Sequence, residues 1–308
     1  MTRLFRLWTL VALASVVAGC NNTVTVSPTS APTTTLPDET VTTSTVTTST
    51  TVVATSTSTS EPAPRCRPNP FTGQFSEGLS TDYRNMMITA HVHDLRTGCG
   101  YSLNPDNRQA TASVFKVMVM AGTLLEAQNQ GRAINDGEMD LMIPMITESA
   151  NSPVRSLWRS FGSSPWFRDQ GVAFGMRETR VVGDDGSAWG LTQTSALDQV
   201  NLLRQVLVGD WGPLDPEYRA VALDLMESVV PSQSWGITAG VPNDWSVAQK
   251  NGFAGLTINS VGWVDEPGTS EGYVVAILTR GWPSHPDGIA AVERISRVIA
   301  ASMIGEVN

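Results

Sequence analysis

The sequence predicts an α+β fold: a five-stranded antiparallel sheet flanked by the terminal helices, with an all-helical subdomain inserted between its strands. The expected elements run in the order helix, two strands, many helices, three strands and helix. Short connections between neighbouring strands favour antiparallel pairing, and the helical block that separates the strands is large enough to pack as a second subdomain. A cleft between two such subdomains is a common place for a ligand.

Residues 1–20 have the pattern of a targeting signal. Arg3 and Arg6 precede an apolar run that is too short to span a membrane comfortably. Val17-Ala-Gly-Cys20 resembles a bacterial lipobox, in which a lipid is attached to the cysteine, here Cys20. The alternative is an ordinary secretory signal with an incidental cysteine. We expect a lipoprotein that is held at the extracytoplasmic face of the cell membrane through this N-terminal lipid.

A change in composition separates residues 21–64 from the rest of the chain. Of these 44 residues, 24 are Ser or Thr, and none is Lys or Arg. Such a segment cannot bury a core, so we expect a disordered linker. The folded domain is then residues 65–308, with 18 basic and 26 acidic residues. This acidic balance argues against nucleic acid as a partner, and we expect a monomer.

The first part of the domain is expected to be a helix and a hairpin. Residues 75–85 look helical, and residues 86–94 form an apolar strand. After a turn at residues 96–98, residues 99–103 return as a second strand. The central helix follows the hairpin.

Cysteine usage agrees with an oxidising compartment. The chain has Cys20, Cys66 and Cys99, so the last two form an even pair if Cys20 carries lipid. Cys66 lies at the start of the domain and Cys99 in the hairpin turn. A disulfide between them would link the N-terminal arm to the sheet.

The three histidines do not predict a metal site. His91 and His93 alternate on an expected strand and therefore share one face, whereas His285 is distant in the sequence. With no further His and no suitable Cys nearby, we interpret them as structural and expect neither a metal nor a cofactor.

The helical block and the last strands have clear boundary signals. Capping side chains, most of them followed closely by proline, mark helix starts. The expected starts are Asn151 or Ser152, Ser164, Thr194 and Asp215. Strands follow at residues 245–250, 258–264 and 272–280, and a helix at residues 287–304 has apolar side chains at core spacing.

Residues 110–131 carry the first candidate for catalysis: a polar turn delivers Ser113, the central helix follows, and Gly131 lies just past its end. Apolar side chains cover most of its circumference, which is typical of a buried helix. Ser113 and Lys116 lie three residues apart, so they share one face and the amine can reach the hydroxyl. Burial lowers the pKa of a Lys, and a neutral Lys can take the proton of a Ser.

Lysine occurs at only two positions. The chain has 20 Lys and Arg residues, of which Lys116 and Lys250 are the only lysines. Arg cannot act as a base because its pKa is too high. The Ser-x-x-Lys pattern also occurs by chance in many chains, so the surroundings of Lys250 matter for its interpretation.

Three motifs share their order and context with one enzyme family. They are Ser113-Val-Phe-Lys116, Ser149-Ala-Asn151 between two expected helices, and Lys250-Asn-Gly252 at the end of an expected strand. The trio S-x-x-K, S-D-N and K-T-G marks class A β-lactamases and penicillin-binding proteins. Residues 75–305 therefore resemble a class A β-lactamase-like, penicillin-recognising serine hydrolase, with a β-lactamase/DD-peptidase-like fold.

The resemblance implies four catalytic residues. Ser113 would be the nucleophile that attacks an amide or lactam carbonyl, and Lys116 its base. Ser149 would pass a proton to the leaving nitrogen, and Lys250 would hold Ser149 and attract a substrate carboxylate. The alternative is that Ser149 only caps a helix and Lys250 is a solvated strand end.

The same resemblance implies substrate-binding residues. Asn151 would bind the amide side chain of the substrate, unless it too only caps a helix. Asn251 stands where the family has Thr and can bond a carboxylate only through its NH₂ group. Gly252 would let the strand approach closely, so that the N–H groups of Ser113 and Phe253 form an oxyanion hole. A simple bulge at Gly252 is the alternative.

The chain departs from the family where the acyl-enzyme would be hydrolysed. Active class A β-lactamases have a loop Glu that activates the deacylating water, but residues 181–190 contain no Glu. Glu178 precedes this stretch, and we do not assign it the role. Asp184 or Asp185 is a possible substitute. Ala150, in place of the usual Asp, weakens the fixing of its loop.

Two functions remain open from the sequence. The first is an envelope-anchored serine hydrolase or acyltransferase that forms an acyl-enzyme on Ser113 and deacylates slowly. Its substrates would be β-lactams or cell-wall-peptide-like amides or esters. The second is a catalytically inactive lipoprotein that uses the same fold as a binding or envelope-scaffold module.

Overall fold

The computed structural model describes residues 65–304, apart from 162–163, 184–185, 210 and 270. The expected signal peptide, linker and Cys20 therefore lie outside the described residues. The predicted five-stranded antiparallel sheet is confirmed, with strand order β2-β1-β7-β6-β5. Its strands are β1 (Met87–Asp94), β2 (Gly100–Leu103), β5 (Ser246–Ala254), β6 (Thr257–Asp265) and β7 (Tyr273–Arg280).

Helices cover both faces of the sheet, so its central strands are apolar on both sides. Successive side chains of a strand point to opposite faces, and β7 shows the result. Val274, Ala276 and Leu278 belong to one buried cluster, whereas Val275 and Ile277 belong to the other. The sheet thus separates two hydrophobic cores.

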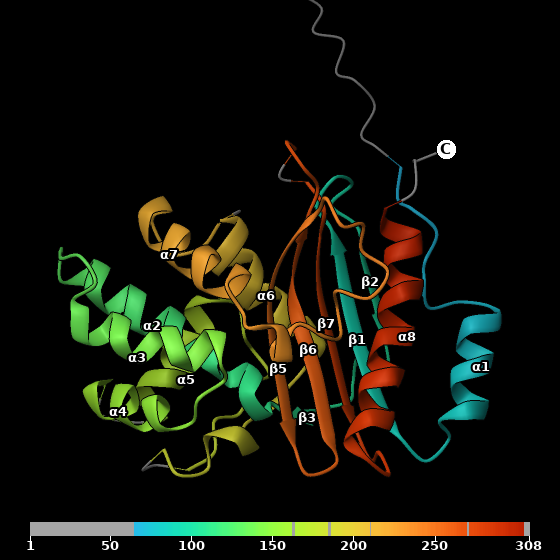
Figure 1. The fold of residues 1–308 in the computed structure, drawn as a ribbon, viewed down its shortest axis with the longest axis horizontal. Coiled ribbons are helices and arrows are strands. Elements are labelled where there is room, and N and C mark those ends of the chain that lie inside the picture. Colours follow the sequence, from blue (N-terminus) through green and yellow to red (C-terminus); the bar gives the residue numbers. More distant parts are fainter. Residues whose placement is uncertain (1–64, 162–163, 184–185, 210, 270, 305–308) are drawn as a thin grey trace, which may run out of the picture. The chain divides into compact units, whose positions relative to one another are not determined.

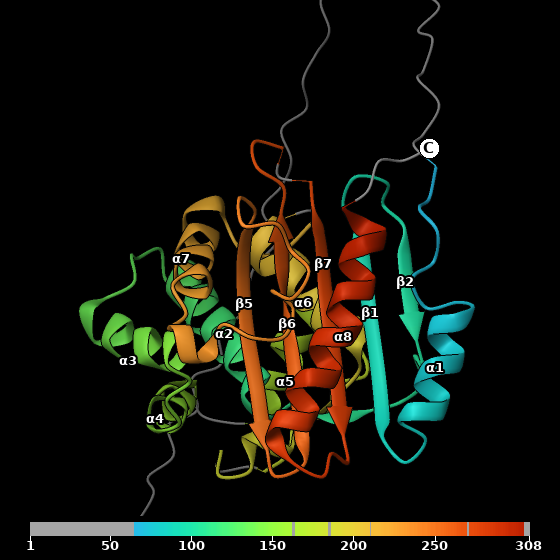
Figure 2. The ribbon, with the colours of Figure 1, turned by 45° about the vertical axis from the view of Figure 1, so that its right-hand side comes forward.

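The terminal helices α1 (Gln74–Asp82) and α8 (His285–Met303) lie on one face of the sheet, as predicted (Figures 1 and 2). Helix α8 begins two residues before the expected Asp287, because Ser284 caps it by accepting a hydrogen bond from the Asp287 N–H. Ile295 and neighbouring apolar residues of α8 enter the core on this face.

The inserted helices lie on the other side of the sheet (Figure 1). They are α2 (Phe115–Asn129), α3 (Asp136–Thr147), α4 (Ser152–Phe161), α5 (Ser164–Ala173), α6 (Ala196–Leu203) with a π-helical continuation (Arg204–Val208), and α7 (Pro216–Glu227). Helix α2 is central, since 12 of its 15 residues are buried. Its apolar circumference therefore packs against neighbours on all sides, as the sequence indicated. Ser195, and not the expected Thr194, caps α6.

Three local features differ from the predicted elements. Ser113 lies in a 3₁₀ turn, Ala112–Val114, that precedes α2, and is not inside the helix. Strand β5 continues past residue 250, so the Lys-Asn-Gly motif lies within the strand. A second, two-stranded sheet pairs β3 (Gln109–Ala110) with β4 (Gln193–Thr194) and was not predicted. Two-residue strands are too short to show a period in the sequence.

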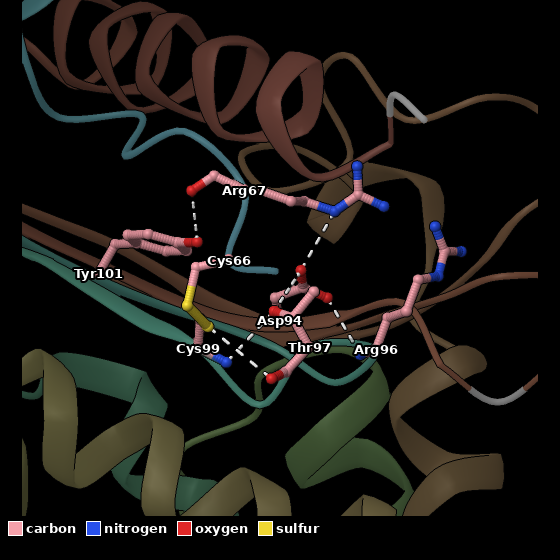
Figure 3. The surroundings of a disulfide bond; sticks show 7 residues. All are labelled: Cys66, Arg67, Asp94, Arg96, Thr97, Cys99 and Tyr101. Atoms are coloured by element: carbon pink, nitrogen blue, oxygen red, sulfur yellow. Dashed lines mark hydrogen bonds and ion pairs between the residues drawn. A yellow bond between two sulfur atoms is a disulfide. The ribbon is translucent and has the colours of Figure 1, made fainter. Parts of the chain in front are cut away.

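A disulfide joins the N-terminal arm to the sheet, as predicted (Figure 3). It links Cys66 and Cys99, which are 33 residues apart in sequence. Beside it, the buried Arg67 guanidinium forms an ion pair with Asp94 at 3.1 Å, and the Tyr101 hydroxyl donates to the Arg67 carbonyl at 2.7 Å. Covalent and polar contacts together attach the arm to the β1–β2 hairpin.

Within the described ranges, none of the helices is both long and apolar enough to cross a membrane.

Candidate active site

The 3₁₀ turn that carries Ser113 is held against the sheet. The side-chain amide of Asn259 in β6 donates to the carbonyls of Ala110 and Thr111 at 2.9 and 3.0 Å. On β5, a methyl group at Gly252 would lie only 2.8 Å from the backbone nitrogen of Ser113. Only glycine permits such an approach, because ordinary contacts of a Cβ atom begin at about 3.4 Å. The strand edge and the serine are therefore as close as the predicted oxyanion hole requires.

Lys116, in the first turn of α2, reaches the hydroxyl of Ser113. Its Nζ lies 3.0 Å from Ser113 Oγ and 3.1 Å from Ser149 Oγ. It also donates to two oxygens that can only accept, the carbonyl of Ser149 at 2.6 Å and Oδ1 of Asn151 at 2.8 Å. A neutral amine has two N–H groups, and these two acceptors use both of them. Its lone pair is then left for the proton of a hydroxyl group.

Ser149 lies between the two lysines, in the loop that joins α3 and α4. Lys250 Nζ is 3.0 Å from Ser149 Oγ and 3.0 Å from the carbonyl of Asn251. Ser149 has a φ of 63°, which is uncommon for a residue other than glycine. Its backbone is held in this costly conformation by the surrounding contacts, which is frequent at functional sites. Both amines therefore meet around one hydroxyl.

Burial changes the protonation of both lysines. Each side chain is fully buried. Burial lowers the pKa of Lys116 to about 8, because the charged form loses its hydration. Burial, and then the positive charge of Lys116, lower the pKa of Lys250 to about 7. Among the described residues, no carboxylate forms an ion pair with either amine. A substantial fraction of each lysine is thus uncharged near neutral pH.

A groove of about 590 Å³ opens above Ser113. Trp189 forms part of its wall, and Lys116 Nζ lies 5.1 Å from the centre of the Trp189 ring. Phe253, half exposed on β5, also lines the groove. The lining residues are Ala112, Ser113, Asn151, Ser152, Arg155, Ser187, Ala188, Trp189, Gly190, Leu191, Phe253 and Ala254.

The substrate-binding residues inferred from the resemblance divide into two groups. Asn151 and Phe253 line the groove, and Gly252 lies against the nucleophile turn. Asn251 is different, because it is buried and its NH₂ group donates to the carbonyls of Gln233 and Trp235 at 2.7 and 2.8 Å. Those protons are the only ones its side chain has, so Asn251 holds a loop and is not placed to bind a substrate carboxylate.

No acidic residue is found in the groove among the described residues. Glu178 forms an ion pair with Arg108, and its backbone N–H donates to Asp198 at 2.9 Å. Glu178 therefore binds residues outside the groove, which agrees with the decision not to assign it the role of the loop Glu. Asp184 and Asp185, the proposed substitutes, lie outside the described residues.

His91 and His285 have described contacts with residues other than the motif serines and lysines. His91 shares a hydrogen bond of 2.7 Å with the Ser102 hydroxyl, and burial lowers its pKa to about 4. His285 packs its ring against that of Phe253, with 4.5 Å between the centroids. Over the described part of the chain, no group of His, Cys, Asp and Glu side chains has a geometry suited to a metal ion.

Comparison with known proteins identifies the family. A family model described as the beta-lactamase enzyme family matches residues 139–303, more than half of the 308-residue chain. The chain belongs to this family. The match includes Ser149, Asn151 and Lys250, and it begins after Ser113 and Lys116. None of the curated proteins compared with the chain matches it.

Solved structures of the family share the fold. A mutant of PBP-A in an acyl-enzyme complex with penicillin G has a TM-score of 0.64 and 21% identity, covering 74% of this chain and 94% of that one. A variant of the class A β-lactamase of the last common ancestor of Gram-negative bacteria has a TM-score of 0.65 and 20% identity, over 76% and 100% of the two chains. A β-lactamase from Streptosporangium roseum has a TM-score of 0.63 and 17% identity, over 74% and 96%. At these identities the likeness extends to the fold alone.

Two groove residues were not assigned a role from the sequence. The contact of Trp189 with Lys116 depends on the path of a loop, which the sequence does not reveal. Arg155 was missed. The available signal was its position in the first turns of the helix that begins directly after Asn151.

Proposed function

We propose that the protein is a serine hydrolase or acyltransferase that forms an acyl-enzyme on Ser113, with Lys116 as the base. Its substrates are β-lactams or cell-wall-peptide-like amides or esters. The observation that carries this proposal is the environment of Lys116 Nζ, where two carbonyl oxygens accept its N–H groups and the Ser113 hydroxyl lies at 3.0 Å. This arrangement suits a neutral amine that accepts a proton.

The proposed acylation step uses these contacts. Lys116 takes the proton of Ser113, and Ser113 Oγ attacks the carbonyl carbon. The backbone N–H groups of Ser113 and Phe253 stabilise the oxyanion. When the C–N or C–O bond breaks, Ser149 donates its proton to the leaving group and recovers one from Lys116 or Lys250. The hydrogen bonds from both amines to Ser149 support this relay.

We further propose that deacylation is slow. Hydrolysis of the ester needs a water that is activated close to Ser113, and no described carboxylate lines the groove. The Trp189 ring lies against Lys116 and covers the base from one side. Without a carboxylate to activate water, the acyl group remains on the serine or passes to a stronger nucleophile. Transfer to an amine or alcohol acceptor would then compete with hydrolysis.

The cellular setting in this proposal comes from the N-terminal sequence. The lipobox-like Val17-Ala-Gly-Cys20 would place the domain on the outer face of the cell membrane, and the Ser/Thr-rich segment would separate it from the bilayer. Mass spectrometry of the membrane-associated protein tests this part: diacylglycerol on Cys20 supports it, and an unmodified, secreted chain contradicts it.

The alternative function is a non-catalytic module with the same fold. It is favoured by the absence of a described acidic residue from the groove. Intact-protein mass spectrometry after incubation with benzylpenicillin separates the two. An adduct with the mass of the penicillin that is lost in Ser113→Ala supports the enzyme. Ser152→Ala, which removes another hydroxyl of the same groove, is the matched control and should keep the adduct. No adduct with several acyl donors would support the module.

A further inference from the structure

The charged side chain described in the lining of the groove is a cation, although the domain around it is acidic. Of the residues that line it, Arg155 is the only charged one among those described. Lys116 Nζ lies 3.0 Å from Ser113 Oγ and Lys250 Nζ 3.0 Å from Ser149 Oγ, so both amines can take up a proton when an anion enters the groove. The whole chain, by contrast, has a formal net charge of −9. A local cationic cavity in an acidic protein attracts anionic ligands selectively.

Arg155 has no partner in the described structure. It is exposed on the second turn of α4, with no hydrogen bond or ion pair to a described residue. Other arginines of this chain are paired: Arg132 with Glu138, and Arg294 with Asp82. An unpaired guanidinium in a groove presents a planar set of N–H donors that fits a carboxylate with two parallel hydrogen bonds.

The position of Arg155 indicates which part of a substrate it meets. Asn151 directly precedes α4, Arg155 is the fourth residue of that helix, and both residues line the groove. The Oδ1 atom of Asn151 accepts from Lys116, which leaves its NH₂ group toward the substrate. In the proposed function this NH₂ group binds the acyl side of the scissile bond. Because Arg155 lines the same groove from the helix that follows Asn151, it is placed to meet the acyl side chain.

We propose that Arg155 is a specificity-determining residue that selects acyl donors with a carboxylate on the acyl side chain. This inference rests on the proposed function, and it names the substrate class. The exposed side chains of Leu191 and Phe253, with the partly buried Trp189, leave apolar contact area in the same groove. A preferred donor thus combines an apolar side-chain group with an anion, in addition to any carboxylate near the leaving group.

Two penicillins provide a matched pair of probes. Carbenicillin differs from benzylpenicillin by one carboxylate on the acyl side chain. The measured quantity is the ratio of their second-order rate constants for acylation of Ser113, obtained from mass-spectrometric time courses. Because Arg155 is exposed, its effect is modest, and we expect Arg155→Gln to lower the carbenicillin-to-benzylpenicillin ratio about 2- to 5-fold. Added salt should lower the ratio for the wild type as well.

Control variants separate recognition from general charge. Arg155→Lys keeps a cation and should retain part of the preference. Arg159→Gln removes the same charge one turn further along α4, outside the groove lining, and should leave the ratio unchanged. An unchanged ratio in Arg155→Gln, or an equal fall in Arg159→Gln, overturns the proposal.

A binding measurement keeps this inference distinct from the proposed acylation. In the Ser113→Ala background, titration calorimetry measures non-covalent binding of the same two penicillins. Tighter binding of carbenicillin that is lost with Arg155→Gln supports the role of Arg155 even if the wild type forms no adduct. If adducts form but neither assay depends on Arg155, the acylation proposal stands and this one fails.

Discussion

Substituting Gly252 with Ala tests whether the close approach of β5 to the nucleophile turn sets the geometry for acylation. The added methyl group would lie 2.8 Å from Ser113 N, 2.9 Å from Val114 N and 3.1 Å from the Thr111 carbonyl oxygen. Against an ordinary limit of 3.4 Å, these contacts are short by about 0.6, 0.5 and 0.3 Å. All three atoms belong to the backbone, so no side chain can rotate away. The strand and the turn must separate.

Two measurements follow from this separation. Overpacking of this kind costs about 1–3 kcal/mol in the free energy of unfolding, which a urea titration detects. The N–H of Ser113 also moves away from the developing oxyanion, and loss of one such donor lowers the rate about 100-fold. Mass-spectrometric time courses with benzylpenicillin measure that rate for wild type and Gly252→Ala.

A glycine in an uncrowded position provides the control for this experiment. At Gly78 in α1 the nearest atom to an added methyl is the flexible end of Arg294, at 3.6 Å. Alanine is the better helix former, so Gly78→Ala should keep the acylation rate and gain up to about 1 kcal/mol in stability. If Gly252→Ala were as stable as the wild type and were acylated at the same rate, the close approach of β5 to the turn that carries Ser113 would not require glycine.

Three further predictions concern the lysines and the disulfide. The acylation rate should rise with pH through about 8 as Lys116 loses its proton, and Lys116→Arg should abolish acylation because a guanidinium stays charged. Unfolding returns the pKa of Lys250 from about 7 to its ordinary 10.5, so the unfolded chain binds more protons between these values and stability rises with pH. The melting temperature of the wild type should therefore rise relative to that of Lys250→Met between pH 7 and 10. A difference that does not change with pH would contradict the lowered pKa of Lys250. Replacing Cys66 and Cys99 by Ser should lower the free energy of unfolding by about 3–4 kcal/mol, the loop-closure value for 33 residues, as measured by urea titration.

Much of the fold follows from sequence patterns that depend on burial. The apolar circumference of α2 indicated a central helix, and apolar runs marked the strands that are covered on both faces. Local backbone conformation was harder to predict from the sequence. Ser113 lies before the helix because Ala112 adopts a φ of 45°. The side chain of alanine gives no sequence signal for this conformation. The β3–β4 pair depends on contacts between segments far apart in the chain.

In the candidate site, too, some features could be predicted from the sequence and others could not. The spacing of Ser113 and Lys116 suffices to place an amine beside a hydroxyl, and the scarcity of lysine drew attention to Lys250. The direction of a strand side chain could not be obtained this way. Asn251 shares a motif with Lys250, yet successive strand residues point to opposite faces, and its amide bonds a loop. Arg155 could be recognised as a candidate only from the structure, because its position in the groove depends on the packing of distant segments.

The shared hydroxyl between two uncompensated amines has a consequence for ligand affinity. An anion that enters the groove favours the charged form of each nearby lysine, and the complex then takes up hydrogen ions from solution. Association should accordingly tighten as the solution is made more acidic, while chemistry at the serine slows. Calorimetric heats that vary with the ionisation enthalpy of the buffer would record that uptake directly.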